Sequence, residues 1–169
     1  MAAERGGRMI SPEALRRYPT FGGLPDATLR AIAMVGQEKP FKAGTRLFDE
    51  SGRLPPGERF FKADESADAL MVVTQGEVDL LTVLGSGKQV FLGTAVPGDL
   101  LGVSSLLEPR EFLLTAIARS HGALIALDAA RLRELCEEDT RLGYQLMRQV
   151  ARDLRARLAQ AVAQLAGMS

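Results

Sequence analysis

The section of the chain between Phe41 and Asp128 alternates short β-rich runs with glycine-containing turns, and no long helical pattern interrupts it. Apolar, β-branched and threonine residues fill these runs, and such residues favour pleated strands. The predicted strands cover residues 69–74, 78–84, 89–92, 112–118 and 123–127. Many short strands without intervening helices predict a mainly β domain with flanking helices, folded as a double-stranded β-helix or jelly roll.

Two short helices are predicted ahead of the strands. Ser11 is expected to be an N-cap, with Pro12 at the first helical position. Pro19 ends this helix, and Pro25-Asp26 opens a second one. Residues 1–10 are rich in glycine and arginine and are expected to form a flexible N-terminal arm.

The helical period returns after the last strand. Asp128 is expected to cap a helix that breaks near Glu138-Asp139. A long helix then follows over residues 140–166, and it spans ~40 Å at 1.5 Å per residue. We therefore divide the chain into the arm, a β domain with its helices over 11–139, and the C-terminal helix.

This C-terminal helix is apolar along one side and longer than a domain of this size can cover. The residues on that side are Met147, Val150, Leu154, Leu158, Ala161 and Leu165. A second copy of the same helix would cover the overhanging part. The sequence therefore predicts a homodimer that forms through residues 140–166.

The composition limits the classes of partner and compartment. Lys and Arg total 21 against 21 Asp and Glu, and this balance argues against a protein that grips phosphate backbones. A single cysteine permits no internal disulfide and fits a reducing compartment. No signal peptide or run of membrane-spanning length is visible, so we expect a cytoplasmic protein without membrane contact.

The sequence provides few residues for catalysis or for metal binding. A metal-dependent jelly roll needs several histidine and carboxylate ligands, but His121 is the only histidine and lies in a predicted hairpin turn. No nucleophile motif surrounds Ser104, Ser105 or Cys136. We predict a non-enzyme without a metal. A haem sensor and a metal-dependent enzyme are the weaker alternatives.

One segment within the strands resembles the phosphate-binding cassette of cyclic nucleotide-binding domains. The segment contains Gly98-Asp99-Leu100-Leu101-Gly102 and ends in Leu114-Thr115-Ala116, and Gln75-Gly76-Glu77-Val78 precedes it. With the helices in the expected order, the resemblance spans nearly all of residues 11–166. It implies the β-roll of that family, and dimerisation through the C-terminal helix.

The resemblance also implies where a ligand would sit. In the family, a glutamate after the second glycine holds the ribose hydroxyl, and an arginine before Ser/Thr-Ala pairs with the cyclic phosphate. Val103 and Leu114 stand at these two positions. The implied pocket residues are Gly102, Val103, Ser104, Ser105, Leu114 and Thr115. The cassette therefore keeps its glycines but lacks its acid and its base.

The missing charges predict weak cyclic nucleotide binding or none. Removing one partner of a desolvated charge pair costs ~2–5 kcal/mol, which moves micromolar binding towards millimolar. Ser104-Ser105 is expected to cap a short helix whose free N–H groups attract anions. Cyclic AMP or cyclic GMP is therefore a disfavoured ligand, and no other cofactor is expected.

Two arginines offer a replacement for the missing positive charge. Arg110 lies in the loop between the two halves of the cassette. Arg157 falls on the same helix face as Leu154 and Ala161. It either serves the neighbouring subunit's pocket or extends to water at the edge of the dimer seam.

A near-repeat occurs at the start of the predicted roll. Residues 43–51 recur in a similar form as 56–66. We expect the first copy to form the core strand, and residues 52–66 to be an inserted loop.

Together these patterns predict a non-catalytic regulatory or sensor module of the cyclic nucleotide-binding type. It would be a dimer that acts through an unidentified protein partner. The printed sequence contains no helix-turn-helix to place in a DNA groove, so direct DNA binding is not expected. The alternative is a genuine sensor of a cyclic nucleotide, or of a more apolar effector, in a remodelled pocket.

Overall fold

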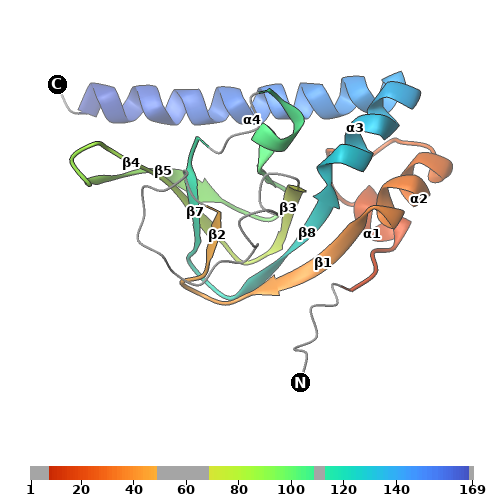
Figure 1. Ribbon diagram of the computed structural model, residues 1–169, viewed down its shortest axis with the longest axis horizontal. Coiled ribbons are helices and arrows are strands. Elements are labelled where there is room, and N and C mark those ends of the chain that lie inside the picture. Colours follow the sequence, from red (N-terminus) through yellow and green to blue (C-terminus); the bar gives the residue numbers. More distant parts are fainter. Residues whose placement is uncertain (1–7, 49–68, 109–112, 168–169) are drawn as a thin grey trace.

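The computed structural model describes residues 8–48, 69–108 and 113–167. Within these residues, eight strands form two four-stranded antiparallel sheets, in the orders β1-β8-β3-β6 and β2-β7-β4-β5 (Figure 1). The strands are β1 Gly36–Phe41, β2 Arg46–Phe48, β3 Ala69–Gln75, β4 Val78–Val83, β5 Gln89–Ala95, β6 Leu100–Leu101, β7 Thr115–Ala118 and β8 Gly122–Asp128. The predicted mainly β roll with flanking helices is confirmed.

Apolar side chains from the two sheets meet in the centre of the roll. Met71 and Val73 of β3, Leu80 of β4 and Leu124 of β8 are at most 2% exposed there. Their alternation with outward-facing residues is the two-residue period of strands. This core holds the sheets together and leaves the outer face of the first sheet for the helices.

The helices form a second core against that outer face. They are α1 Pro12–Arg16, α2 Asp26–Met34, α3 Ala129–Glu138 and α4 Thr140–Gly167. Leu29 and Ile32 of α2 pack with Leu142 and Leu146 of α4, all fully buried. The first half of α4 is therefore part of the domain, and its second half continues over the β4–β5 hairpin (Figure 1).

The predicted helix boundaries agree with the caps in the structure. The Ser11 hydroxyl accepts a hydrogen bond from the Ala14 N–H at 3.2 Å, and the Asp128 carboxylate accepts one from Arg131 N–H at 3.1 Å. Asp139 separates α3 from α4 and accepts from the N–H of Leu142 at 3.3 Å. These hydrogen bonds satisfy N–H groups that a helix start leaves unpaired.

Strand β1 was not predicted from the sequence, because its residues are mostly polar and include Pro40. Among the described strands, β1 lies at the edge of its sheet beside β8, so the missing N–H of a proline is tolerated. Arg8 also exchanges backbone hydrogen bonds with Glu38 at 2.8 and 2.9 Å. The predicted arm over residues 1–10 is therefore wrong at Arg8, and residues 1–7 lie outside the described residues.

Other boundaries differ by a few residues. β7 begins at Thr115 rather than Phe112, and Phe112 lies outside the described residues. The first copy of the near-repeat contributes β2, as predicted. The insertion predicted at residues 52–66 falls in the part of the chain that the structure does not describe.

Two turns at one end of the roll approach each other at their glycines. Gly76 has a φ of +79°, and a Cβ there would lie 2.5 Å from the carbonyl oxygen of His121. The backbone N–H of Ala43 donates to His121 Nδ1 at 3.2 Å. His121 therefore lies in a turn, as predicted, where its ring accepts a hydrogen bond from a neighbouring loop.

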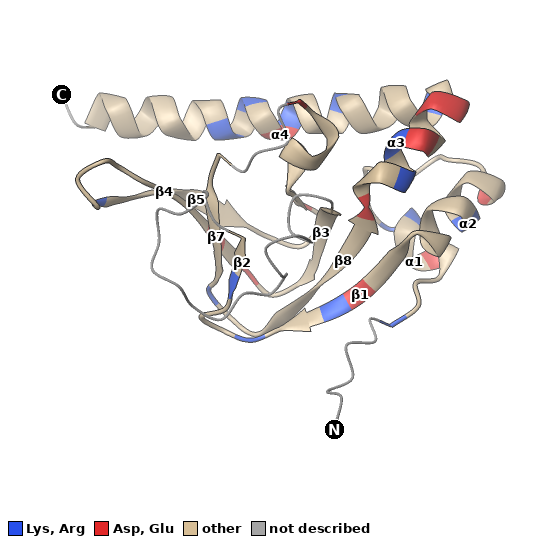
Figure 2. Cartoon of the chain, viewed as in Figure 1, with Lys and Arg blue, Asp and Glu red and all other residues tan. Residues whose placement is uncertain are grey.

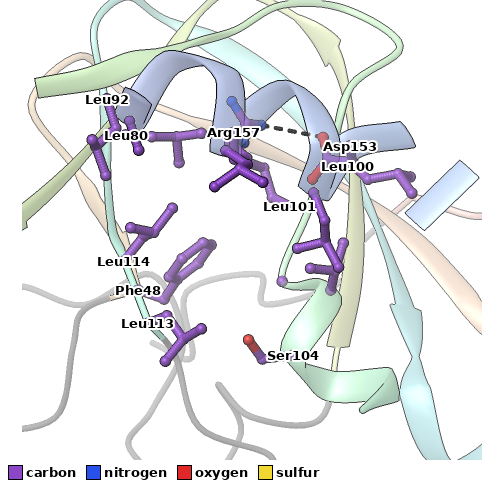
Figure 3. Close-up of a pocket in the computed structure, with 15 residues that line it drawn as sticks. Phe48, Leu80, Leu92, Leu100, Leu101, Ser104, Leu113, Leu114, Asp153 and Arg157 are labelled. Atoms are coloured by element: carbon purple, nitrogen blue, oxygen red, sulfur yellow. Dashed lines mark hydrogen bonds and ion pairs between the residues drawn. The ribbon is translucent and has the colours of Figure 1, made fainter. Parts of the chain in front are cut away.

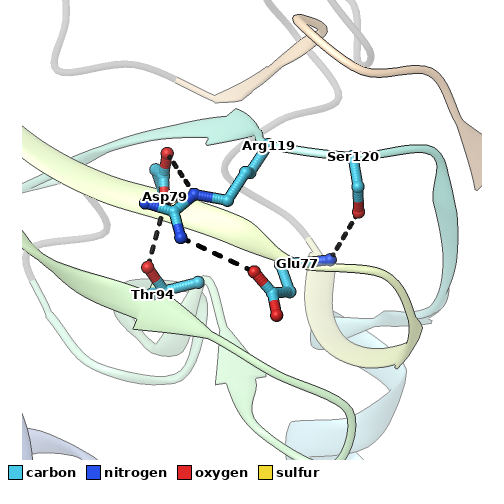
Figure 4. A network of polar contacts seen from close by, with 5 residues as sticks. All are labelled: Glu77, Asp79, Thr94, Arg119 and Ser120. Atoms are coloured by element: carbon cyan, nitrogen blue, oxygen red, sulfur yellow. Dashed lines mark hydrogen bonds and ion pairs between the residues drawn. The ribbon is translucent and has the colours of Figure 1, made fainter.

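Charged side chains on the outside of the second sheet form a small network (Figure 4). Arg119 contacts Asp79 at 3.1 Å and Glu77 at 3.7 Å, and Thr94 donates to Asp79 at 2.9 Å. The Arg119 side chain is 53% exposed, and exposed ion pairs contribute at most about 1 kcal/mol each. The network connects β4 and β5 with the residue that follows β7, and we assign no ligand to it.

Candidate functional site

A cavity of about 260 Å³ lies between the roll and the second half of α4 (Figure 3). The roll provides Phe48, Leu80, Leu92, Leu100, Leu101, Gly102, Val103, Ser104, Leu113 and Leu114, and α4 provides Asp153, Leu154, Arg157, Leu158 and Ala161. Most of these side chains are aliphatic. The cavity is slightly smaller than the ~300–1,000 Å³ of typical small-molecule sites.

Four of the six predicted pocket residues line this cavity. They are Gly102, Val103, Ser104 and Leu114. Ser105 and Thr115 are buried, at 1% and 0% exposure, and do not line it. Val103 and Leu114 therefore face the space in which the sequence pattern would otherwise place two charged groups.

The short helix of the cassette starts differently from the prediction. Gly102 occupies the N-cap position with a φ of 72°, and the helix is a single 3₁₀ turn from Val103 to Leu106. The Ser105 hydroxyl donates to the Gly102 carbonyl at 2.7 Å instead of capping an N–H. The predicted cap by Ser104-Ser105 is wrong, and a single 3₁₀ turn provides no extended helix dipole for an anion.

Among the described residues that line the cavity, the two charged side chains both come from the α4 wall. Asp153 and Arg157 form an ion pair, with 3.4 Å between a carboxylate oxygen of Asp153 and a guanidinium nitrogen of Arg157. Their side chains are 12% and 16% exposed. The pair lies along one side of the cavity, and Ser104 lies across from it (Figure 3).

Burial changes the pKa of Asp153. Desolvation raises the pKa of Asp153, Arg157 opposes this effect, and Asp99 adds to it. A carboxyl group that resists ionisation inside an apolar cavity can accept a proton more readily than an exposed one. Asp153 was not predicted from the sequence, although its spacing of four residues from Arg157 is that of a helical ion pair.

The structure places Arg157 in the cavity of its own chain. One of the two roles predicted for it assigned its charge to a neighbouring subunit's pocket, but it lines the pocket beside Leu154 and Ala161 instead. The other candidate, Arg110, lies outside the described residues. The positive charge at this site is therefore held by α4 and is already paired.

The residues predicted to form a dimer seam divide into two groups. Val150 is 2% exposed and packs into the core of its own domain, so it is not available to a second copy. Met147, Leu154, Leu158 and Leu165 are 37%, 42%, 64% and 68% exposed, and Ala161 is partly buried beside the cavity. The unpaired apolar surface lies along the later part of α4.

Other types of site find no support in the described residues. No group of three or more His, Cys, Asp or Glu side chains is arranged to hold a metal ion within residues 8–48, 69–108 and 113–167.

Burial raises the pKa of the half-buried Cys136 thiol, and nearby Glu137 and Asp139 add to the shift. Among the described helices, none is both long enough and apolar enough to span a bilayer.

Comparisons with known proteins agree with this architecture. The profile of the cyclic nucleotide-binding domain matches residues 52–139. A crystal structure from Geobacter metallireducens GS-15, described as a cyclic nucleotide-binding protein, is 35% identical, with a TM-score of 0.71, and the match covers 89% of this chain and 99% of that one. The N-terminal domain of a transcriptional regulator from Streptomyces coelicolor A3(2) is 30% identical, with a TM-score of 0.60, and the match covers 83% and 90% of the two chains.

A curated relative matches over a similar length. The CRP-like cAMP-activated global transcriptional regulator of Mycobacterium tuberculosis is 26% identical over 143 residues, which is 85% of this chain. The chain spans only 58% of the length of that regulator.

Proposed function

This chain belongs to the cyclic nucleotide-binding domain family, and we propose that it is a dimeric, non-catalytic regulatory module with weak or no affinity for cyclic nucleotides. It acts through a protein partner. Support for a regulatory role comes from the mycobacterial relative, which is a transcriptional regulator activated by cAMP. The departure from that relative lies in the chemistry of the cavity.

The observation that carries the proposal is that none of the described residues in the cavity lining offers an unpaired cation. By the resemblance to the cassette, Val103 and Leu114 stand where its acid and base would be, and both line the cavity, whereas Arg157 is paired with Asp153. A cyclic phosphate bound here would exchange water for aliphatic side chains and would face a carboxylate. The loss of one charge partner weakens binding by ~2–5 kcal/mol, or about thirtyfold or more.

Titration calorimetry with cyclic AMP and cyclic GMP tests this proposal. We expect no saturable binding at micromolar concentrations. The double variant Val103→Glu with Leu114→Arg restores both charges and should raise affinity at least about thirtyfold. Met34→Arg is the control for an added arginine, because Met34 is 87% exposed on α2 and does not line the cavity. Micromolar binding by the unmodified protein, abolished by Arg157→Ala, would overturn the proposal.

The second half of α4 supports the dimer. Met147, Leu154 and Ala161 recur every seven residues, and so do Leu158 and Leu165. This heptad spacing is typical of paired helices. Residues 158–167 contain no charged side chain, as the uncoloured end of α4 in Figure 2 shows. A second copy of α4 would cover these side chains and close the outer side of the cavity wall.

A further inference from the structure

We propose that the cavity binds a small apolar carboxylic acid, whose carboxylate pairs with Arg157 in place of Asp153. This inference rests on the proposed function, because it assigns a ligand to the same pocket. It identifies the effector of the module as a monocarboxylate with an aliphatic or aromatic body.

The walls of the cavity determine the body of the ligand. Leu80, Leu92, Leu101 and Leu114 surround the space, and Ser104 is the one uncharged side chain in the lining that carries a hydroxyl (Figure 3). Each buried CH₂ group of a ligand gains ~0.8 kcal/mol against such walls. A purine base would lose its hydrogen bonds to water without replacement. The volume of about 260 Å³ also favours a ligand at the small end of the usual range.

The ion pair determines the polar end of the ligand. A guanidinium has five N–H donors in a planar fork that matches the two oxygens of a carboxylate. Within the described residues, the only hydrogen bond from the Arg157 side chain is a single long contact of 3.4 Å to Asp153. A ligand carboxylate that binds in the fork geometry would make two shorter bonds. Arg157 can therefore exchange Asp153 for a ligand at a gain in hydrogen bonding.

When a ligand carboxylate replaces Asp153 as the partner of Arg157, two carboxyl groups lie near one cation and repel each other. Protonation of one of them removes this repulsion. Burial raises the pKa of Asp153, with Arg157 opposing and Asp99 reinforcing the shift, so Asp153 is the group that takes up a proton from solvent. The neutral Asp153 then stops competing for Arg157 and can donate a hydrogen bond to the ligand. Binding should therefore strengthen as the pH falls towards the raised pKa of Asp153.

Calorimetric titration of the full chain with octanoate tests the inference, with octanamide as the uncharged analogue of the same length. Octanoate should bind at least about tenfold more tightly than octanamide. Arg157→Gln should weaken octanoate binding about thirtyfold or more and leave octanamide unchanged. The matched control is Arg155→Gln, an exposed arginine on the same helix, which should change neither.

Asp153→Asn provides a test with the opposite sign. It removes the competitor for Arg157, so octanoate affinity at neutral pH should rise about tenfold and lose its pH dependence. A merely structural role for the pair predicts weaker binding in both variants. Equal binding of octanoate and octanamide, no binding of either, or weaker binding in Asp153→Asn would each overturn the inference. Because none of these outcomes involves cyclic nucleotides, each leaves the proposed function standing, whereas micromolar cyclic AMP binding that requires Arg157 defeats the proposed function itself.

Discussion

The two halves of α4 carry the same apolar periodicity but have different surroundings. In the first half Leu142, Leu146 and Val150 are at most 2% exposed, because α2, α3 and the first sheet cover them. In the second half Leu154 and Leu158 are 42% and 64% exposed above the cavity. An apolar helix face therefore indicates that something covers it, but the pattern alone does not say whether the partner is the same domain, a ligand or a second chain.

The boundary between the two halves is also where the charged pair occurs. Asp153 and Arg157 follow Val150 by one and two turns, and Arg157 is the last charged residue of the helix. Before them, α4 is part of the domain core. After them, its side chains are available to other partners.

The largest expected effect is the loss of stability when a buried side chain in the first half of α4 is truncated. The same truncation in the second half should have little effect. Leu146→Ala removes a fully buried side chain and should lower the free energy of unfolding by about 2–5 kcal/mol. Leu165→Ala, at 68% exposure, should change it by less than about 0.5 kcal/mol in the monomer. Urea denaturation at low protein concentration measures both. Equal losses would mean that the second half of α4 also packs against its own domain.

A charge in the second half should separate the dimer. Leu165→Glu would place two carboxylates in the proposed seam without touching the cavity lining, and should weaken association about a hundredfold. Gln164→Glu adds the same charge one residue earlier and should leave association intact. Analytical ultracentrifugation distinguishes the two variants. A wild type that is already monomeric at micromolar concentration would contradict the dimer.

The smallest expected effect lies at the boundary, in the pH dependence of stability. The pKa of Asp153 is raised above its ordinary value of 3.8, chiefly by burial. At pH values between 3.8 and the raised pKa of the folded state, Asp153 binds more protons in the folded protein than in the unfolded protein. The free energy of unfolding therefore falls as the pH rises through this window. Asp153→Asn has no carboxyl group to titrate at this position, so its free energy of unfolding should not fall for this reason. The wild type should therefore become less stable relative to Asp153→Asn as the pH rises through that window.

Denaturation of both proteins across a pH series measures this effect. Glu134→Gln, which removes an exposed carboxylate from α3, is the control for the loss of one negative charge. Parallel pH profiles for the wild type and Asp153→Asn would show that Asp153 is hydrated in solution.

The strands with apolar alternation and glycine turns were predictable from the sequence, because local pattern and burial agree in them. β1 was not, since an edge strand needs few apolar residues and tolerates Pro40. Val103 and Leu114, which the cassette resemblance singled out, line the cavity. Asp153 was missed because a charged residue on an apolar face looks solvated until tertiary packing is known. The cap predicted for Ser104-Ser105 was wrong because the Ser105 hydroxyl donates to the Gly102 carbonyl instead.

The uncharged end of α4 has a consequence for how the protein would assemble under different conditions. Residues 158–167 offer no charge for dissolved ions to screen. An interface built from them should therefore be nearly insensitive to ionic strength, and should weaken on cooling, as contacts that depend on apolar hydration do.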